Sequence, residues 1–354
     1  MKNSSTSSSK VFLATRGSRI LILALKEIAF LALGLCIWVA LAEATSHLGG
    51  PESTLEYRVN DLLKNHRDVE AIAVGHSHNM ALDFSVLGID GYHAWDGGSD
   101  VFEVEYELRS LVPKLHNLRA VFMPMAYWGF VRDNSAVPER RVRNLDYYRA
   151  FHSGPISASD RWLYLRASSW NIVRSDHWKV IVEAVLRHKG DTTLPAGIDP
   201  ADGHSIQSDD FKPMSYEELV EYTKSDPAGV KAHLDIQDAC KAGHANLAKD
   251  TYTCVVRIIK FLQTRGIRVI FFTPPYFATY TELYYPETIR SMKARMEELV
   301  DEYAVEYYDF STDKDLIHNN LLFKNDDHLD ADGAVVFSKK LRAAMHAHEA
   351  VDDL

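Results

Sequence analysis

The chain has 354 residues, of which 46% are hydrophobic and 25% are charged, enough for one large α/β domain or two smaller ones. Its formal net charge at pH 7 is -10; the first 27 residues carry five basic residues and one acidic residue, so the remainder carries -14. An acidic body argues against nucleic acid as a partner, because phosphate binding needs clustered lysine and arginine.

The N-terminal part contains an apolar segment long enough to cross a membrane. Residues 28–42 (IAFLALGLCIWVALA) carry no charge, and residues 20–25 (ILILAL) extend the run beyond Lys26 and Glu27. A lysine near the membrane interface can keep its charged end in water while its stem lies along apolar surface. The total of about 20 residues matches the thickness of a bilayer.

We therefore predict a cytoplasmic tail at residues 1–19 and a transmembrane anchor at residues 20–44, because basic residues precede the apolar run. This orientation places the body outside the cytoplasm, in the periplasm or at the cell surface. A cleaved signal peptide is the alternative, since residues 42–44 (AEA) fit a small-residue cleavage site. The body is exported on either interpretation.

Cysteine usage is compatible with export. Cys36 lies within the apolar segment, which leaves Cys240 and Cys254 in the body of the chain. Two closely spaced cysteines in an exported domain favour a disulfide bond between them. Two separate buried thiols are the alternative.

After the anchor, short apolar runs alternate with helical patterns. Apolar runs bounded by turn residues predict strands at residues 70–74, 92–95, 120–125, 267–275 and 305–310. Apolar residues at helical spacing predict helices at residues 101–118, 255–266, 289–303 and about 331–347. Strands separated by helices predict an α/β fold: a three-layer αβα sandwich with a five-stranded parallel, flavodoxin-like sheet.

Residues 131–250 interrupt this alternation. They are rich in Arg, Asp, His and Trp, and residues 189–214 are polar, with Gly and Pro throughout. Because so long a plain connection is uncommon in a compact domain, we predict an inserted subdomain with a flexible loop. The α/β domain then consists of residues 55–130 and 251–354.

A serine and a histidine fall at the same edge of the predicted sheet. Ser77 follows the first strand directly, and His328, in the stretch KNDDHLDADGA, precedes the last helix. Ligands of such sheets bind beyond the carboxyl ends of the strands. A serine becomes a good nucleophile when an oriented base takes its proton, so this pair predicts nucleophilic catalysis. The alternatives are that Ser77 caps a short helix and that His328 is structural.

These segments resemble the conserved sequence blocks of the SGNH (GDSL) hydrolase superfamily. Within that superfamily they are most similar to the membrane-tethered members associated with O-acylation of bacterial polysaccharides. Gly75-His76-Ser77 resembles the first block, Asp96-Gly97-Gly98-Ser99 the second, and HLDADGAVVFSKKL, which starts at His328, the histidine block. The resemblance spans residues 70–130 and 255–345.

The resemblance implies a role for each matching residue. Ser77 is the expected nucleophile and His328 its base. The oxyanion hole is expected to contain the backbone amides of Gly97 and Ser77. No cofactor and no metal ion are expected.

Two positions depart from the family pattern. The usual acid stands three residues before the histidine, where this chain has Asn325. We favour Asp327 as the acid, because an Asp directly before this histidine recurs in the similar proteins, with Asp326 and Asn325 as alternatives. The third block normally supplies an oxyanion-hole asparagine, but residues 125–130 (MAYWGF) contain none. Loss of one such donor costs about 3 kcal/mol, so an inactive protein is an alternative.

Three histidines and a carboxylate near these motifs, His76, His78, His328 and Asp326, offer a metal site as an alternative. Residues two apart on a turn rarely converge on one ion, which argues against it. We therefore interpret His76 and His78 as supporting residues. The tyrosine-rich stretch at residues 276–285 forms either a sugar-binding rim or a partly buried loop.

The sequence thus predicts an exported, membrane-anchored serine acyl-esterase or O-acetyltransferase. Its expected substrate is an acylated glycan, such as a cell-surface or exported polysaccharide. A membrane-bound acyltransferase is a possible partner that delivers the acyl group. The alternative is a catalytically inactive scaffold that binds glycan or such an acyltransferase.

Overall fold

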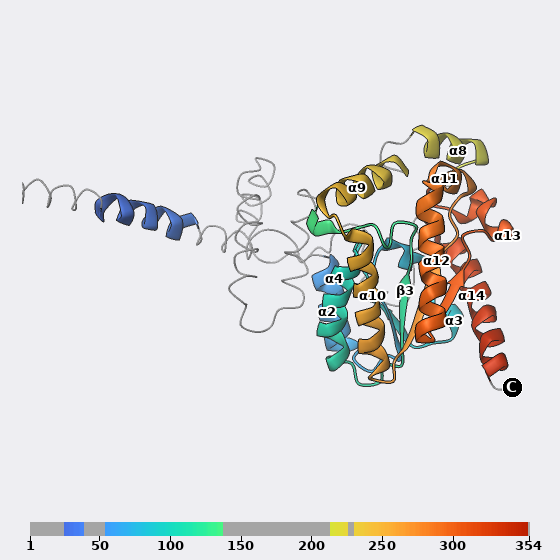
Figure 1. The fold of residues 1–354 in the computed structure, drawn as a ribbon. Coiled ribbons are helices and arrows are strands. Elements are labelled where there is room, and N and C mark those ends of the chain that lie inside the picture. The colour runs from blue at the N-terminus through green and yellow to red at the C-terminus, as the bar shows by residue number, and fades with distance from the viewer. Residues whose placement is uncertain (1–24, 39–53, 137–212, 226–229, 353–354) are drawn as a thin grey trace, which may run out of the picture. The chain divides into compact units, whose positions relative to one another are not determined.

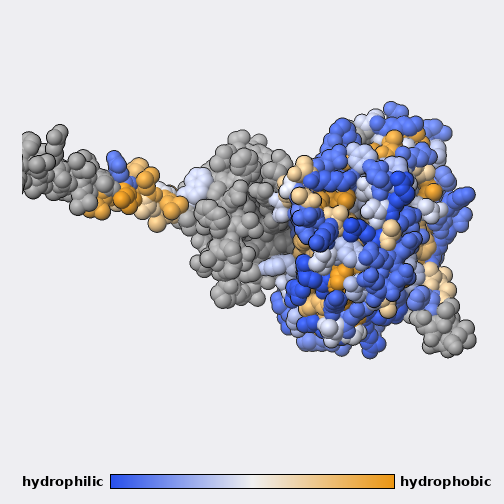
Figure 2. Space-filling model, viewed as in Figure 1, coloured by the Kyte–Doolittle hydropathy of each residue, from blue (hydrophilic) through white to orange (hydrophobic). Residues whose placement is uncertain are grey.

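A computed structural model describes residues 25–38, 54–136, 213–225 and 230–352. The chain divides into two units, which are described separately. Residues 25–38, in the first unit, form a helix with exposed apolar side chains (Figure 2), among them Phe30 and Leu31. Among the described helices, none is long and apolar enough to span a membrane. The predicted tail at residues 1–19 and both ends of the predicted anchor lie outside the described residues.

The second unit is built on one parallel sheet of five strands. The strand order is β2-β1-β3-β4-β5, and every neighbouring pair is parallel. This is the flavodoxin-like order, so the predicted sheet is confirmed. The strands are β1 (Ala71–Ala73), β2 (Gly91–His93), β3 (Ala120–Pro124), β4 (Arg268–Thr273) and β5 (Glu306–Asp309).

Helices cover both faces of the sheet, which gives the predicted three-layer αβα arrangement (Figure 1). The helices of one face are α2 (Thr54–Asn65), α4 (Val101–Leu111), α10 (Leu247–Gln263) and α12 (Pro286–Tyr303). Those of the other are α3 (Phe84–Leu87) and α14 (Ala331–Asp352), with α13 (Lys314–Ile317) beside them. Short helical turns are η1 (Ser77–Ala81), η2 (Val112–Lys114), η3 (Asn134–Ala136) and η5 (Asn320–Leu322).

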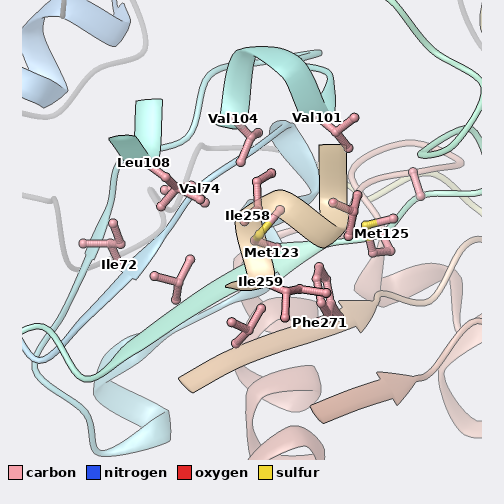
Figure 3. Packing of buried hydrophobic residues seen from close by; sticks show 14 of the residues in the cluster. Ile72, Val74, Val101, Val104, Leu108, Met123, Met125, Ile258, Ile259 and Phe271 are labelled. Carbon is pink, nitrogen blue, oxygen red and sulfur yellow. The ribbon is translucent and has the colours of Figure 1, made fainter. Parts of the chain in front are cut away.

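The strand side chains alternate between two apolar clusters, one on each face. Ile72 and Val121 pack in the cluster under α4 and α10, whereas Ala73 and Phe122 face the cluster under α3 and α14. Figure 3 shows the first cluster, where side chains of α4 and α10 meet those of the strands. Strands β1 and β3 and most of β4 are buried on both faces, so these strands read as continuous apolar runs in the sequence, whereas the edge strand β5 (EYYD) is only partly buried.

Two helices of the segment predicted as an insertion are described, α8 (Tyr216–Ser225) and α9 (Val230–Gly243). Helix α9 packs on the α/β body, because Gln237 accepts a hydrogen bond from the Tyr284 hydroxyl (3.1 Å) and donates one to Thr288 (3.2 Å). Helix α10 begins at Leu247, inside the predicted insertion. Residues 137–212 lie outside the described residues.

The predicted disulfide is wrong. Cys240 and Cys254 are both free and buried. Cys240 Sγ lies 3.3 Å from the Asp133 carbonyl oxygen, whereas Cys254 Sγ lies 3.3 Å from the carbonyl oxygen of Val101 on α4. The two thiols face different neighbours, as the alternative of separate buried thiols states.

Candidate active site

Ser77 lies in the turn that follows β1. The chain turns at Gly75, whose φ of 111° is readily adopted only by glycine. Asn79, which is fully buried, donates from Nδ2 to the carbonyl oxygens of Val74 (2.9 Å) and His76 (3.2 Å). These bonds fix the turn, so that Ser77 remains partly exposed between buried neighbours.

His328 lies in the loop between η5 and α14. The backbone N–H of Lys324 donates to the His328 carbonyl oxygen at 2.9 Å, and Phe323 and Leu329 form a single antiparallel bridge. Phe323 and Leu329 are also buried in the cluster under α14. The loop is therefore a tight hairpin that is fixed to the core at both ends, with His328 at its base, next to the bridge residue Leu329.

The structure brings Ser77, His328 and Asp327 together. His328 Nε2 lies 2.6 Å from Ser77 Oγ, and His328 Nδ1 lies 2.6 Å from Asp327 Oδ1. An ionised carboxylate only accepts hydrogen bonds, so the network assigns the ring proton to Nδ1 and leaves Nε2 as the acceptor of the serine proton. This is the arrangement of a nucleophile, a base and an orienting acid.

The two alternative partners of His328 occupy different places. Asn325 Oδ1 accepts from the His328 backbone N–H at 2.8 Å and lies at hydrogen-bond distance (3.1 Å) from the ring Nδ1. Asp326 is fully buried, and its carbonyl oxygen accepts from the Phe277 N–H at 2.9 Å. Asp327 has the shortest contact with the imidazole, and the geometry favours it as the acid.

The electrostatics suit a general base. Burial alone raises the pKa of Asp327, but the neighbouring His328 outweighs it and holds that pKa far below its ordinary value. Burial lowers the pKa of His328, but the charge and hydrogen bond of Asp327 outweigh burial and raise it above its ordinary value. Each group thus favours the charged form of the other.

Gly97, the expected oxyanion residue, lies in the loop after β2. The backbone N–H of Asp96 donates to the Gly75 carbonyl oxygen at 2.9 Å, which ties this loop to the turn that carries Ser77. Among the described residues, apart from its chain neighbours, no heavy atom lies within 4 Å of the position where a Cβ of residue 97 would stand.

Asn134 supports the same loop and was missed by the sequence analysis. Its side-chain Nδ2 donates to the Gly98 carbonyl oxygen (3.0 Å) and to Glu103 Oε2 (2.6 Å), and its backbone N–H donates to Asp100 Oδ2 (2.6 Å). Both amide protons are used, so Asn134 holds the loop rather than contacting a substrate. The polar run RDN at residues 132–134, after an apolar stretch, was the available signal.

His76 and His78 form a hydrogen-bonded chain that starts at the backbone. His76 Nε2 lies 3.2 Å from the Pro124 carbonyl oxygen, and the two Nδ1 atoms lie 2.8 Å apart. The carbonyl can only accept, so His76 carries its proton on Nε2 and accepts at Nδ1. His78 therefore carries its proton on Nδ1.

His78 is held neutral beside the imidazole of His328. Burial, followed by the neighbouring His328, lowers the pKa of His78 to about 3, although the carboxylate and carbonyl of Asp327 oppose the shift. Its ring stacks on that of His328, with centroids 4.8 Å apart and planes 24° apart. His78 thus packs against His328 without adding a charge.

Helix α9 places a further histidine at the site. His233 Nδ1 lies 3.8 Å from Asp327 Oδ2 and 2.7 Å from the Tyr280 hydroxyl. A single histidine in a segment predicted as an insertion gives no sequence signal for this position. The described part of that segment therefore contributes directly to the surroundings of Asp327.

The tyrosines at residues 276–285 do not form a rim. Tyr276, Tyr280 and Tyr284 are buried, and their rings follow one another at 5.1 and 5.7 Å between centroids. The first ring contacts His78 at 5.3 Å. These three buried rings pack against one another and against His78, so the second alternative, a partly buried segment, is the one observed.

No protein family model and no curated protein matches the chain. Solved structures do match it, among them a crystal structure from Bacteroides fragilis NCTC 9343 described as a "putative acylhydrolase". That protein is 12% identical, with a TM-score of 0.36 over 87% of this chain and 94% of its own. At this level of similarity the chemistry has to be argued from the site itself.

Proposed function

We propose that the protein is a serine acyl-esterase or O-acyltransferase of the SGNH type. The observation that carries the proposal is the continuous chain of contacts from Ser77 Oγ through His328 to Asp327, with both distances at 2.6 Å. The resemblance of the three sequence blocks supports the same class.

Ser77 Oγ attacks the acyl carbonyl carbon, and its proton passes to His328 Nε2. The carbonyl oxygen becomes an oxyanion, for which the amides of Ser77 and Gly97 are the expected donors. His328 then gives the proton to the departing alkoxide, which leaves the acyl group on Ser77. An incoming hydroxyl, from water or from a sugar, gives its proton to His328 and attacks the acyl carbon. The bond between the acyl group and Ser77 Oγ then breaks, and His328 returns the proton to Ser77 Oγ.

The proposed substrate is an acyl ester of a glycan outside the cytoplasm. The apolar run at residues 20–44 and the basic residues before it support a single-pass anchor with an exported body. A membrane-bound acyltransferase that delivers acetyl groups is the proposed partner. On this basis we favour polysaccharide O-acetylation over plain hydrolysis.

A chromogenic acetyl ester tests the chemistry. We expect release of the chromophore by the full-length protein, and loss of that release after a serine-directed inhibitor or in Ser77→Ala. Ser110→Ala, on the outer side of α4, is the matched control and should keep full activity. Activity that persists in Ser77→Ala overturns the catalytic proposal, and an inactive wild type favours the scaffold.

Fractionation tests the anchor. The full-length protein should stay in the membrane pellet after a salt wash. Salt releases proteins held by charge, whereas the apolar run is held by the hydrocarbon core of the bilayer. A soluble product that begins at Thr45 would instead identify a cleaved signal peptide.

A further inference from the structure

One histidine connects the start of α10 to the loop that follows β3. His244 Nδ1 lies 2.8 Å from Asp133 Oδ2 in that loop, and His244 Nε2 lies 2.8 Å from Asp250 Oδ2 in the first turn of α10. Ionised carboxylates only accept hydrogen bonds, so each contact needs a proton on the imidazole nitrogen. A histidine carries both protons only in its charged form. The geometry is therefore that of an imidazolium that bridges two carboxylates.

Neutral His244 cannot keep both contacts. One nitrogen would then present a lone pair to a carboxylate oxygen 2.8 Å away, and two acceptors at that distance repel each other. The side chain of Asp250 is 46% exposed and that of Asp133 is 10% exposed, so Asp250 is the one that can turn to water. Asp133 then keeps its hydrogen bond with His244 but loses the attraction of a positive charge.

The groups packed around His244 favour its charged form. The hydrogen bond with Asp250, followed by that with Asp133, raises the pKa of His244 above its ordinary value and outweighs burial. Phe102, on α4, stacks its ring on the imidazole with centroids 6.5 Å apart and brings no charge. Asp100, just before α4, accepts from a backbone N–H of the same loop. Burial raises the pKa of Asp100 to about 6, so it loses its proton at a lower pH than His244 does.

The loop that contains Asp133 also supports the loop of the expected oxyanion donor. Asn134, the next residue, donates to the Gly98 carbonyl oxygen at 3.0 Å and to Glu103 Oε2, on α4, at 2.6 Å. Gly97 directly precedes Gly98. A change in the position of Asp133 can therefore reach the amide of Gly97 through two contacts.

We propose that doubly protonated His244 is a positioning residue for the candidate active site. It fixes residues 132–136 against the start of α10 and, through Asn134, the loop that carries Gly97. This hold is complete while His244 is charged and weakens when His244 loses its proton. The hold itself goes beyond the proposed function, whereas its effect on catalysis rests on that function.

Thermal unfolding of the full-length protein between pH 6 and pH 9 tests the hold. Since the pKa of His244 is raised in the folded state, its contribution to stability is complete below about pH 6.5 and is lost as the pH rises through the folded value. His244→Gln offers only an uncharged donor, so its Tm should lie roughly 2–4 °C below that of the wild type at pH 6 and approach it at pH 9. His116→Gln, at an exposed histidine beside Asp68, is the control and should show no such trend.

Asp250→Asn distinguishes positioning from packing, because it leaves the ring in place and changes an exposed side chain. It removes the largest cause of the raised pKa of His244. The stability contribution of His244, measured against the double variant with His244→Gln, should therefore be lost at a lower pH, nearer 6.5. A Tm difference that does not change with pH, or an unshifted loss in Asp250→Asn, overturns the proposal.

Hydrogen exchange followed by mass spectrometry tests the reach to the active site without relying on activity. Residues 96–99 and 132–136 should exchange faster in His244→Gln than in the wild type at pH 6, and equally fast at pH 9. The ratio of the kcat of the wild type to that of the variant, on a chromogenic acetyl ester, should fall towards one over the same range. His328 does not affect this ratio, because it titrates in both proteins.

Unchanged exchange at residues 96–99 at pH 6 overturns the role of His244 at the site. In an active enzyme, a kcat ratio that does not change with pH overturns it as well. A wild type that exchanges as expected but has no esterase activity contradicts the proposed function alone.

Discussion

Two loops meet at the site, residues 75–79 after β1 and residues 324–330 before α14. The first contributes the imidazoles of His76 and His78, and the second that of His328. Burial lowers the pKa of His78 to about 3, whereas for His328 the contact with Asp327 outweighs burial and raises the pKa. The carboxylate lies 2.6 Å from His328 Nδ1 and 3.8 Å from His78 Nε2.

The difference shows that burial alone does not set the protonation of a histidine in this site. Asp327, at hydrogen-bond distance from His328, reverses the lowering of the pKa that burial causes there. The same carboxylate lies about one ångström further from His78 and does not reverse it. The serine side of the site is therefore held by uncharged hydrogen bonds, and the histidine side by a charge pair. The two sides should fail differently when they are mutated.

The largest effect is expected where the two loops touch. Ser77→Ala and His328→Ala each break the contact between Oγ and Nε2, so each should lower kcat by about 10⁶-fold if the triad acts as a unit. The double variant should be no worse than either single one. Losses that multiply in the double variant would show that the two residues act independently.

The charge pair is tested by Asp327→Asn, which keeps the shape and removes the charge. We expect a loss of about 10⁴-fold in kcat. Without the carboxylate, burial lowers the pKa of His328, so the acid limb of the pH profile of kcat/KM should move to lower pH. In the wild type this limb should lie above pH 6.5, the ordinary pKa of histidine.

Asp326→Asn and Asn325→Ala are the matched controls for that loss. Both residues lie in the same loop as Asp327, but neither has the shortest contact with the ring. Their effects on kcat should be far smaller, with the acid limb nearly unchanged. A large loss in Asn325→Ala alone would assign the orienting role to the asparagine.

On the uncharged side, Asn134→Ala removes the support of the loop that carries Gly97. It leaves Glu103 and the Gly98 carbonyl without this buried donor, which costs about 1–3 kcal/mol. If the loop positions an oxyanion donor, kcat should fall about tenfold or more while KM changes little. Asn117→Ala, whose amide is exposed, is the control. Lower stability with unchanged kcat would limit Asn134 to a structural role.

The sequence predicted those parts of the site that depend on strand ends. Ser77 and His328 follow from the edge rule for parallel sheets, because apolar runs locate the strands and the residues after them. Asp327 could be preferred over Asp326 only by resemblance, since the loop turn decides which carboxylate reaches the ring. The hairpin formed by Phe323 and Leu329 supplies that turn.

Residues that reach the site from distant segments left no local signal. His233 lies on α9, and its approach to Asp327 depends on how that helix packs against Tyr284 and Thr288. The cysteines were misjudged for the same reason: spacing along the chain does not show that Cys240 and Cys254 face different neighbours. Tertiary packing decides such contacts, and a single sequence does not encode it in any short pattern.

The smallest effect is expected for two carboxyls on α4, Glu107 and Glu105, whose pKa values are shifted in opposite directions. Burial raises the pKa of Glu107 well above its ordinary value. Glu105 is half-buried, and its bonds to Arg257 and Arg109 outweigh the effect of burial and lower its pKa to about 2. A buried carboxyl with no hydrogen-bond partner among the described residues and a half-buried one with two arginines thus have opposite pKa shifts.

Glu107→Gln should therefore stabilise the fold, increasingly as the pH rises above about 4, the pKa of an unfolded glutamate. Above that value the wild type must hold a proton that the unfolded chain releases, and each pKa unit of difference is worth about 1.4 kcal/mol. Glu105→Gln should destabilise the fold at neutral pH, and this penalty should shrink as the pH falls from about 4 towards 2. Thermal unfolding of both variants and the wild type over pH 2–8 measures the two trends. Parallel trends in the two variants would contradict the opposite pKa shifts, because they would mean that burial alone sets the pKa of both carboxyls.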